Sequence, residues 1–374
     1  MNIVQIIPYM HSDAGGPPVV VKDFHRLFRE LGHNARLITT NWGFSDDQYA
    51  RQQLVGIFDN IDILTINFAS VLLGKLRLHL KASLTNADLI VLHTLWHPLN
   101  YFVAKAARSI GIPYLVMPHG MLDPNSLARK RLKKIAYKNL IENYVLRHAS
   151  GLIFTTDLEE ELATRALEAG FVGHIVPLGV DLPPQAKQYE YHPDLKLLFL
   201  GRLHEKKGLD VLIKSVVKLI HRGLHITLDI TGDGDKAYIR NLAKLIPGDC
   251  SSKITFTGPR SGEDKSKAYL DNDLFVLSSH QENFAIVVAE AMSYGMPVIV
   301  SDRVNTWPYV SSANAGCVVS HDTLSQELEV SIIGYYENRD LLEEHGRNAR
   351  DSAQTRLSLD NTRVLLGKAI SFYE

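Results

Sequence analysis

The chain has 374 residues, of which 45% are hydrophobic and 22% are charged, and its formal net charge is -1. This length suggests about two domains, and the apolar content is ample for two cores. The near-neutral charge excludes a general attraction to nucleic acid, and no apolar run reaches the roughly 20 residues that a membrane-spanning helix needs.

Two features bear on the cellular compartment. Cys250 and Cys317 are the only two cysteines, and neither lies in a Cys/His cluster, so a reducing compartment is favoured over a structural disulfide. The apolar run 2–7 is short, lacks a basic start and stops at Pro8, unlike a secretory signal. We expect a cytoplasmic protein that can lie at the inner face of a membrane.

Short apolar runs alternate with amphipathic stretches along the whole chain. Near-continuous apolar runs are typical of parallel strands covered on both faces, and the alternation indicates doubly wound sheets. In the first half we predict a helix at 18–31 and strands at 3–7, 35–39, 89–92, 114–117, 152–154 and 174–176. In the second half we predict a helix at 208–222 and strands at 195–200, 225–230, 253–256, 274–277, 298–300 and 317–319.

The polar stretch 178–194 contains Pro183, Pro184 and Pro193 and is the best candidate for a linker. The sequence therefore predicts an α/β protein with two Rossmann-like doubly wound domains, 1–180 and 190–357. Ligands of such sheets bind beyond the carboxyl ends of the strands. Two facing sheets would place a shared cleft between the domains.

Three candidate sites lie in the first half. Gly15 and Gly16 follow the first strand and precede a helix that a proline can open; they either let a backbone approach a ligand closely or form a turn. His119 ends a strand and can hydrogen-bond a sugar hydroxyl, unless it is a structural histidine. Trp96 can stack on an acceptor sugar, with His93 beside it; the spacing of His93 and His97 could suggest a metal, but Pro98 argues against the helix that such a site needs.

A basic amphipathic stretch follows at 129–138. It is either a solvated face or a surface that docks on anionic lipid. Its cations are Arg129, Lys130, Arg131, Lys133, Lys134 and Lys138.

The loop after the strand 195–200 carries Arg202 and Lys207. Two cations at a strand end can hold a diphosphate and stabilise the charge that develops as it leaves; the alternative is a solvated basic loop. Further on, Gly232 begins a match to the dinucleotide fingerprint, but the strand is not the first of its domain and the expected acid is missing. We predict a tight turn near a base or phosphate there, with Arg260 able to reach the base.

Glu282 and Glu290 are the strongest pair. Between them stand Asn283, Phe284, Ala285, Ile286, Val287, Val288 and Ala289. We predict a helix that starts near Asn283 or Phe284, because asparagine can cap, and whose free amides face an anion. Eight helical residues rise about 12 Å, similar to the span from a ribose across a diphosphate to a hexose. A capping Glu and a surface Glu are the alternative.

Two D-x-D triplets, Asp233-Gly234-Asp235 and Asp271-Asn272-Asp273, have a pattern that elsewhere holds divalent metal. Because both lie at turns beside strands, we interpret them as turn residues. We expect no metal and no cofactor.

Taken together, these stretches resemble the family 4 retaining glycosyltransferases of GT-B fold over nearly the whole chain. The resemblance implies that Glu290 holds the ribose, that Glu282 and His119 lie by the donor sugar, and that Arg202 and Lys207 clasp the diphosphate. The substrate-binding set that we expect is Gly15, Gly16, Gly232, Arg260, Asn283, Phe284, Ala285, Ile286, Val287 and Glu290. Ala285 departs from the family, which often has glycine there, and narrows the space beside the sugar.

The resemblance also implies retention of anomeric configuration, an acceptor side in 1–180, and a nucleotide-sugar side in 190–357. A last helix, 358–374, is expected to pack back on the first domain. A UDP-sugar donor and a glycan or lipid-linked glycan acceptor in polysaccharide biosynthesis are favoured. The alternatives are a nucleotide-sugar epimerase, which would need additional acid/base groups, a non-catalytic nucleotide-sugar sensor, and a dehydrogenase.

Overall fold

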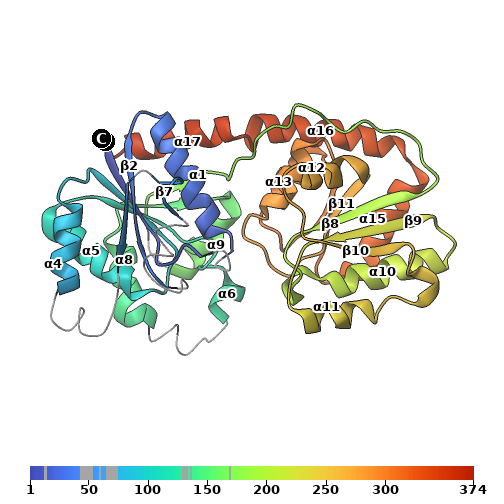
Figure 1. Ribbon diagram of the computed structural model, residues 1–374, viewed down its shortest axis with the longest axis horizontal. Coiled ribbons are helices and arrows are strands. Elements are labelled where there is room, and N and C mark those ends of the chain that lie inside the picture. The colour runs from blue at the N-terminus through green and yellow to red at the C-terminus, as the bar shows by residue number, and fades with distance from the viewer. Residues whose placement is uncertain are drawn as a thin grey trace. The chain divides into compact units, whose positions relative to one another are not determined.

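The computed structural model describes residues 1–11, 15–42, 54–58, 60–64, 75–128, 134, 137–167 and 170–374. The chain divides into two compact units, each with its own parallel sheet (Figure 1). The N-terminal unit holds Met1–Pro177 and Thr362–Glu374, and the C-terminal unit holds Leu178–Asn361. The α/β fold with two Rossmann-like domains, predicted from the sequence, is confirmed.

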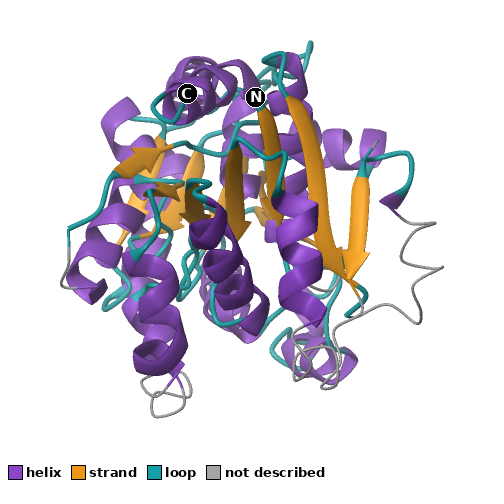
Figure 2. Ribbon diagram, turned by 90° about the vertical axis from the view of Figure 1, so that its left-hand side faces the viewer, coloured by secondary structure: helices purple, strands orange, loops and turns teal. Residues whose placement is uncertain are grey.

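The sheet of the N-terminal unit has seven strands in the order β3-β2-β1-β4-β5-β6-β7. The sequence predicted all of them except β3, a short strand at the edge of the sheet. Figure 2 shows these strands side by side with helices around them. The strands are β1 (Asn2–Ile6), β2 (Asn34–Thr40), β3 (Ile61–Leu64), β4 (Leu89–His93), β5 (Tyr114–Met117), β6 (Gly151–Phe154) and β7 (Gly173–Ile175).

The helices of this unit form where apolar residues recur at helical spacing. Helix α1 begins at Pro17, a residue suited to a first turn, and buries Val21, Phe24 and Phe28. The described helices are α1 (Pro17–Glu30), α4 (Lys75–Leu84), α5 (Pro98–Ile110), α6 (Pro124–Ala128), the π-helix η2 (Lys138–Glu142), α8 (Asn143–Arg147) and α9 (Asp157–Leu167).

The end of the chain packs in the N-terminal unit. Helix α17 (Leu359–Ser371) is followed by Tyr373, whose hydroxyl lies 2.8 Å from His174 Nε2 and donates to the Ser150 carbonyl. The Thr362 hydroxyl donates to the Pro177 carbonyl over 2.8 Å. These contacts bring the C-terminal residues against β6 and β7.

The C-terminal unit has a sheet of six strands in the order β10-β9-β8-β11-β12-β13. Its strands are β8 (Leu195–Leu200), β9 (Ile226–Thr231), β10 (Ile254–Gly258), β11 (Leu274–Leu277), β12 (Val298–Ser301) and β13 (Gly316–Val319). Its α-helices are α10 (Leu209–His221), α11 (Lys236–Ala243), α12 (Gly262–Asp271), α13 (Ile286–Ser293), α14 (Trp307–Ala313), α15 (Leu324–Glu337) and α16 (Asp340–Arg356). Two short 3₁₀ turns, η3 (Glu205–Lys207) and η4 (Gly248–Cys250), complete it.

Each sheet reverses its strand order at one point, between β1 and β4 in the N-terminal unit and between β8 and β11 in the C-terminal unit. Crossovers to either side of such a switch point lie on opposite faces of the sheet, because parallel connections keep a right hand. The loops that leave the carboxyl ends of the two strands there separate and leave room for a ligand.

Within the described residues, none of the helices combines the length and the apolarity that crossing a bilayer requires. Cys250 and Cys317 are free thiols.

Candidate active site

The helix between the two glutamates begins later than the sequence predicted. Helix α13 starts at Ile286, and its N-cap is Ala285, in the left-handed region at φ 56° and ψ 67°. Phe284 is 4% exposed, so the chain turns at Ala285 after anchoring this ring in the core. Left-handed backbone strains a residue with a Cβ and suits glycine, which is the residue that the resemblance expected there.

Glu282 therefore lies in the loop before α13 and not on the helix. Its backbone is held at both polar groups, since its amide donates to the Arg303 carbonyl over 2.9 Å and its carbonyl accepts from the Asn305 amide over 3.1 Å. The first amides of α13, on Ile286 and Val287, precede any partner within the helix. Such free amides can bind an anion, and here they follow Glu282 closely in the chain.

Lys207 and Glu282 form an ion pair at the switch point of the C-terminal sheet. Lys207 Nζ lies 2.7 Å from Glu282 Oε1, and the side chains are only 14% and 19% exposed. Lys207 follows β8 and Glu282 follows β11, and these two strands are neighbours. Partial burial weakens solvent screening, so each charge holds the other in place.

Close contact between the two loops depends on Gly208. A Cβ on this residue, which has φ 63°, would lie 2.1 Å from the Ser278 carbonyl oxygen. The loops are joined by the His280 amide, which donates to the Lys206 carbonyl over 2.7 Å, and by the Ser278 hydroxyl, which donates to the Gly208 carbonyl over 3.0 Å. Glycine at this position lets Lys207 approach the β11 loop.

Glu290 has two protein partners that the sequence did not reveal. Lys265 Nζ lies 2.6 Å from Glu290 Oε1, and the Tyr269 hydroxyl donates to Oε2 over 2.8 Å. Both partners come from α12, at positions i and i+4 of one helix face. A carboxylate has about four acceptor sites, so both oxygens can still accept from a ribose diol, as the resemblance implied.

The remaining cations and glycines lie at the carboxyl ends of neighbouring strands. Arg202 follows β8 and is exposed, and Arg260 follows β10 and is partly exposed. Gly232, after β9, has a structural reason to be glycine, because a Cβ there would lie 1.8 Å from the Gly201 carbonyl oxygen. Its contact with substrate stays a prediction, as do the roles of Asn283 and the two arginines.

In the N-terminal unit, the predicted residues follow β1, β4 and β5, and the first two of these strands flank the other switch point. Gly15, with φ 85°, and Gly16 precede α1, and a Cβ on either would meet no atom within 4 Å. His119 follows β5, at φ 54°. Its Nε2 lies 3.1 Å from Nδ1 of His93, the last residue of β4. Burial lowers the pKa of His119 to about 3, so its ring is uncharged at neutral pH.

His93 does not fit the expected place beside an acceptor. Its side chain is 0% exposed, since it lies between Gln5, His119 and the edge of Phe24. A buried ring cannot touch an acceptor, so any influence on a substrate must pass through His119.

Trp96 stays an acceptor-side prediction. Its backbone is left-handed, at φ 65°, and its amide donates to Glu142 Oε2 over 3.0 Å. Lys134 Nζ lies 5.3 Å from the centre of the indole ring. Lys134 and Lys138 are the only members of the basic stretch 129–138 that lie within the described residues.

Three of the four carboxylates of the D-x-D triplets make hydrogen bonds or ion pairs within the protein. Asp233 accepts from the Gly234 amide, and Asp235 caps α11 through the Tyr238 amide. Asp273 lies 3.4 Å from Lys187. Elsewhere in the C-terminal unit, ligand atoms of His221, Asp249 and Cys250 lie within 4.8 Å of one another. His221 is the last residue of α10, and Asp249 and Cys250 lie in η4, so the group lies at the amino-terminal side of the strands that follow.

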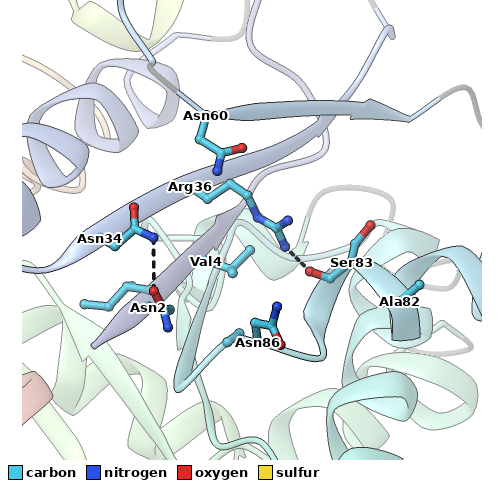
Figure 3. A pocket seen from close by; sticks show the side chains of 10 residues that line it. Asn2, Val4, Asn34, Arg36, Asn60, Ala82, Ser83 and Asn86 are labelled. Atoms are coloured by element: carbon cyan, nitrogen blue, oxygen red, sulfur yellow. Dashed lines mark hydrogen bonds between the residues drawn. The ribbon is translucent and has the colours of Figure 1, made fainter.

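A cavity of about 380 Å³ lies beside the amino ends of β1 and β2, at the end of the N-terminal sheet opposite to His93 and His119. Figure 3 shows Asn34 donating to Asn2, and the Arg36 guanidinium donating to the Ser83 carbonyl. Ligands of open α/β sheets bind at carboxyl ends, so we assign this cavity no part in the active site.

Comparison with known proteins finds a family model that matches each half of the chain. Residues 15–179 match the glycosyl transferase 4-like domain, and residues 194–338 match the family of glycosyl transferases group 1. The phosphatidyl-myo-inositol mannosyltransferase of Mycobacterium tuberculosis is 31% identical over 311 residues, covering 81% of this chain and 78% of that protein. The chain belongs to the group 1 glycosyltransferases.

Two further proteins extend the comparison of this glycosyltransferase. The GDP-mannose:cellobiosyl-diphosphopolyprenol alpha-mannosyltransferase of Xanthomonas campestris is 23% identical over 328 residues, covering 87% of this chain and 84% of that protein. The crystal structure of Anabaena HepE in complex with UDP superposes with a TM-score of 0.82 at 19% identity and covers 100% of both chains. At that identity the match concerns the fold, which in HepE is that of a GT-B protein.

Proposed function

We propose that this glycosyltransferase moves a hexosyl unit from a nucleoside-diphosphate sugar to a glycan or lipid-linked glycan, with retention of anomeric configuration. The observation that carries the proposal is the switch point of the C-terminal sheet. There, Lys207 pairs with Glu282 in the loop that leads into α13, and Glu290 lies within that helix. Cations, helix amides and a carboxylate are the groups that would hold a diphosphate and a ribose.

The chemistry that the family resemblance implies is substitution on one face of the sugar. The bond from the anomeric carbon to the phosphate oxygen breaks, and the acceptor oxygen bonds to the same face. The acceptor proton passes to the departing phosphate oxygen. Arg202, Lys207 and the first amides of α13 stabilise the charge on the diphosphate, and the protein contributes mainly orientation.

In this proposal Lys207, which pairs with Glu282, and the exposed Arg202 supply the positive charge that a divalent ion supplies in a metal-dependent transferase. We therefore propose that the reaction needs neither a metal nor a cofactor. The turn and pairing roles of Asp233, Asp235 and Asp273 support this, because their oxygens already serve the protein.

The donor has two candidates. A UDP-sugar is favoured by the resemblance, and UDP occupies the structurally similar HepE. GDP-mannose is favoured by the name of the Xanthomonas relative and is consistent with the mannosyltransferase name of the mycobacterial one. The acceptor side is proposed to lie in the N-terminal unit near Trp96. Polysaccharide biosynthesis at the inner face of a membrane, with contact through 129–138, completes the proposal.

The test is a turnover assay with UDP-α-glucose and GDP-α-mannose as donors. Octyl glycosides and prenyl-diphosphate-linked saccharides serve as acceptors, and free nucleotide and product are measured together. We expect nucleotide release that depends on acceptor, and an α-linked product by NMR. A β-linked product would overturn retention. Epimerised donor without transfer would support an epimerase, and binding without turnover would support a sensor.

A further inference from the structure

A line of buried side-chain hydrogen bonds crosses the switch point of the N-terminal sheet. The Gln5 amide nitrogen donates to the Val21 carbonyl over 3.2 Å, and Gln5 Oε1 lies 3.1 Å from His93 Nε2. His93 Nδ1 then lies 3.1 Å from His119 Nε2, with the two rings stacked at 5.3 Å. The line runs from α1 through β1 and β4 to the loop after β5.

The direction of every bond in this line follows from its first member. A backbone carbonyl can only accept, so Gln5 must turn its amide nitrogen toward Val21. Gln5 Oε1, an acceptor, then faces His93 Nε2, which must carry a hydrogen. Gln5 and His93 are 0% exposed, and burial holds the pKa of His93 well below its ordinary value. A neutral His93 has one N–H, so its Nδ1 accepts.

The same logic extends to His119. Its Nε2 must donate to His93 Nδ1, and its ring is uncharged at neutral pH because burial lowers its pKa to about 3. The remaining nitrogen, Nδ1, therefore has a lone pair and no hydrogen. Within the described part of the chain, Nδ1 makes no hydrogen bond and is not enclosed.

The backbone of His119 has a left-handed conformation that the residue would rarely adopt in an unfolded chain. His119 has φ 54° and is followed by Gly120 at φ 72°, and the Gly120 amide donates to the buried Glu159 over 2.6 Å. A non-glycine residue in this region is uncommon and persists only where its surroundings fix it. The neighbours of His119 therefore determine where its ring lies as well as which ring nitrogen carries the hydrogen.

We propose that Gln5 and His93 are positioning residues that hold His119 in the Nε2–H tautomer, so that its Nδ1 accepts a hydrogen bond from a hydroxyl of the donor sugar. The second half of this statement rests on the proposed function. An acceptor at this point selects a sugar position that can donate, such as a hexose hydroxyl. It disfavours a uronic acid carboxylate, whose oxygens would face the lone pair without a hydrogen between them.

The tautomer is measured without any substrate. Protein labelled with ¹⁵N-histidine is examined by long-range ¹H–¹⁵N NMR, and the signals of His119 are assigned by their loss in His119→Asn. We expect an unprotonated Nδ1 and a protonated Nε2, unchanged between about pH 5 and pH 8. Gln5→Met should mix the tautomers, whereas Gln326→Met, on the exposed face of α15, should not. A protonated Nδ1 in the parent would overturn the inference, whatever the enzyme transfers.

Kinetics separates positioning from mere support of the fold. His93→Phe removes the acceptor for His119 Nε2–H, and we expect kcat/KM to fall about ten-fold or more. His93→Asn keeps an oxygen near the place of Nδ1 and should recover most of that loss. Equal loss in both variants, with melting temperatures like that of the parent, would contradict the positioning role.

Donor analogues test the contact with the sugar. Deoxy and deoxyfluoro forms of UDP-glucose or GDP-mannose, whichever the enzyme uses, are compared by dissociation constant. Fluorine accepts a hydrogen bond weakly and cannot donate one. When the hydroxyl that contacts His119 is replaced, the deoxy and deoxyfluoro analogues should therefore bind equally poorly. His93→Phe should then reduce their affinity no further. Tighter binding of the fluoro form would mean that His119 donates. If neither donor binds, the proposed function fails while the NMR result stands by itself.

Discussion

Lys207 Nζ and Glu282 Oε1 lie 2.7 Å apart, at the ends of two neighbouring strands where the order of the C-terminal sheet reverses. The pair joins the loop after β8 to the loop that leads into α13. Neither residue can be changed without leaving a partly buried charge beside the proposed diphosphate site.

Lys207→Met should therefore reduce kcat by about 100-fold or more, the scale for loss of one stabilising group at a developing charge. It should also lower the melting temperature, because Glu282 loses its partner. Lys206→Met is the matched control, since Lys206 Nζ lies 3.5 Å from Gln281 in the same pair of loops. Steady-state kinetics of Lys207→Met, Glu282→Gln and the double variant measure the coupling. Additive effects on both kcat and stability would show that the pair is not a unit.

Arg202 and Glu290 should differ in what they contribute. Leaving-group charge grows during bond cleavage, so Arg202→Ala should lower turnover by about 100-fold. Glu290→Ala should mainly weaken nucleotide binding, by about 1.5–3 kcal/mol for a hydrogen bond to a charged group. Calorimetry with UDP and GDP, together with kinetics, distinguishes the two effects.

Glu290→Ala also deprives Lys265 and Tyr269 of their acceptor. Lys265→Met is the control, because it breaks the ion pair and leaves the carboxylate for the ribose. Near-normal turnover in Arg202→Ala, or parent-like diphosphate affinity in Glu290→Ala, would place the donor elsewhere.

Activity should survive treatment with EDTA, because Arg202 and Lys207 supply the positive charge. Initial rates before and after chelation and desalting provide the measurement. Complete loss, with rescue by Mg²⁺ or Mn²⁺ but not by Na⁺, would restore a metal role to the D-x-D triplets.

Glu142 should make stability depend on pH. Its side chain is 0% exposed, and burial raises its pKa from 4.5 to about 7. The proton on Glu142 therefore adds to the free energy of unfolding. This contribution is complete below about pH 4.5 and is lost as pH rises through about 7. The shift corresponds to about 3 kcal/mol. Relative to Glu142→Gln, the parent should lose stability from pH 5 to pH 8. Glu337→Gln, at an exposed position, should differ from the parent in free energy of unfolding by the same amount at every pH. If the difference between the parent and Glu142→Gln also does not change with pH, the expected pKa of Glu142 is wrong.

The basic stretch 129–138 should give weak, salt-sensitive binding to vesicles that contain phosphatidylserine, at about 1 kcal/mol for each cation near the surface. Lys138 Nζ donates to the Ala166 carbonyl over 2.7 Å, and Lys134 Nζ donates to the Ser126 carbonyl, so both cations of the stretch that the structure describes already have a partner within the protein. Flotation at low and high salt, with phosphatidylcholine vesicles as the control, makes the measurement. No binding at low salt would leave the stretch as a solvated face.

Sequence patterns were informative wherever the signal was local. Buried parallel strands such as β8 and β11 appear as apolar runs, and the glycines and cations that follow them mark the carboxyl ends. The edge strand β3, Ile61–Leu64, was missed because Asp62 interrupts its apolar run, so the near-continuous pattern of a buried parallel strand is absent. The start of α13 was predicted two or three residues early, because burial of Phe284 and the left-handed turn at Ala285 outweighed the capping preference of Asn283.

The sequence by itself determined the α/β class, the alternation of strands and helices, and the order of the motifs that identify the family. Only the tertiary structure decided that Lys207 pairs with Glu282. It also brought Lys265 and Tyr269 to the carboxylate of Glu290. The same holds for the line of hydrogen bonds through Gln5 and His93 that we propose sets the tautomer of His119. The reason is physical. The spacing of apolar residues indicates which face of a single helix or strand is buried. The partners named here come from different elements. Which elements become neighbours depends on the crossovers that order the sheet.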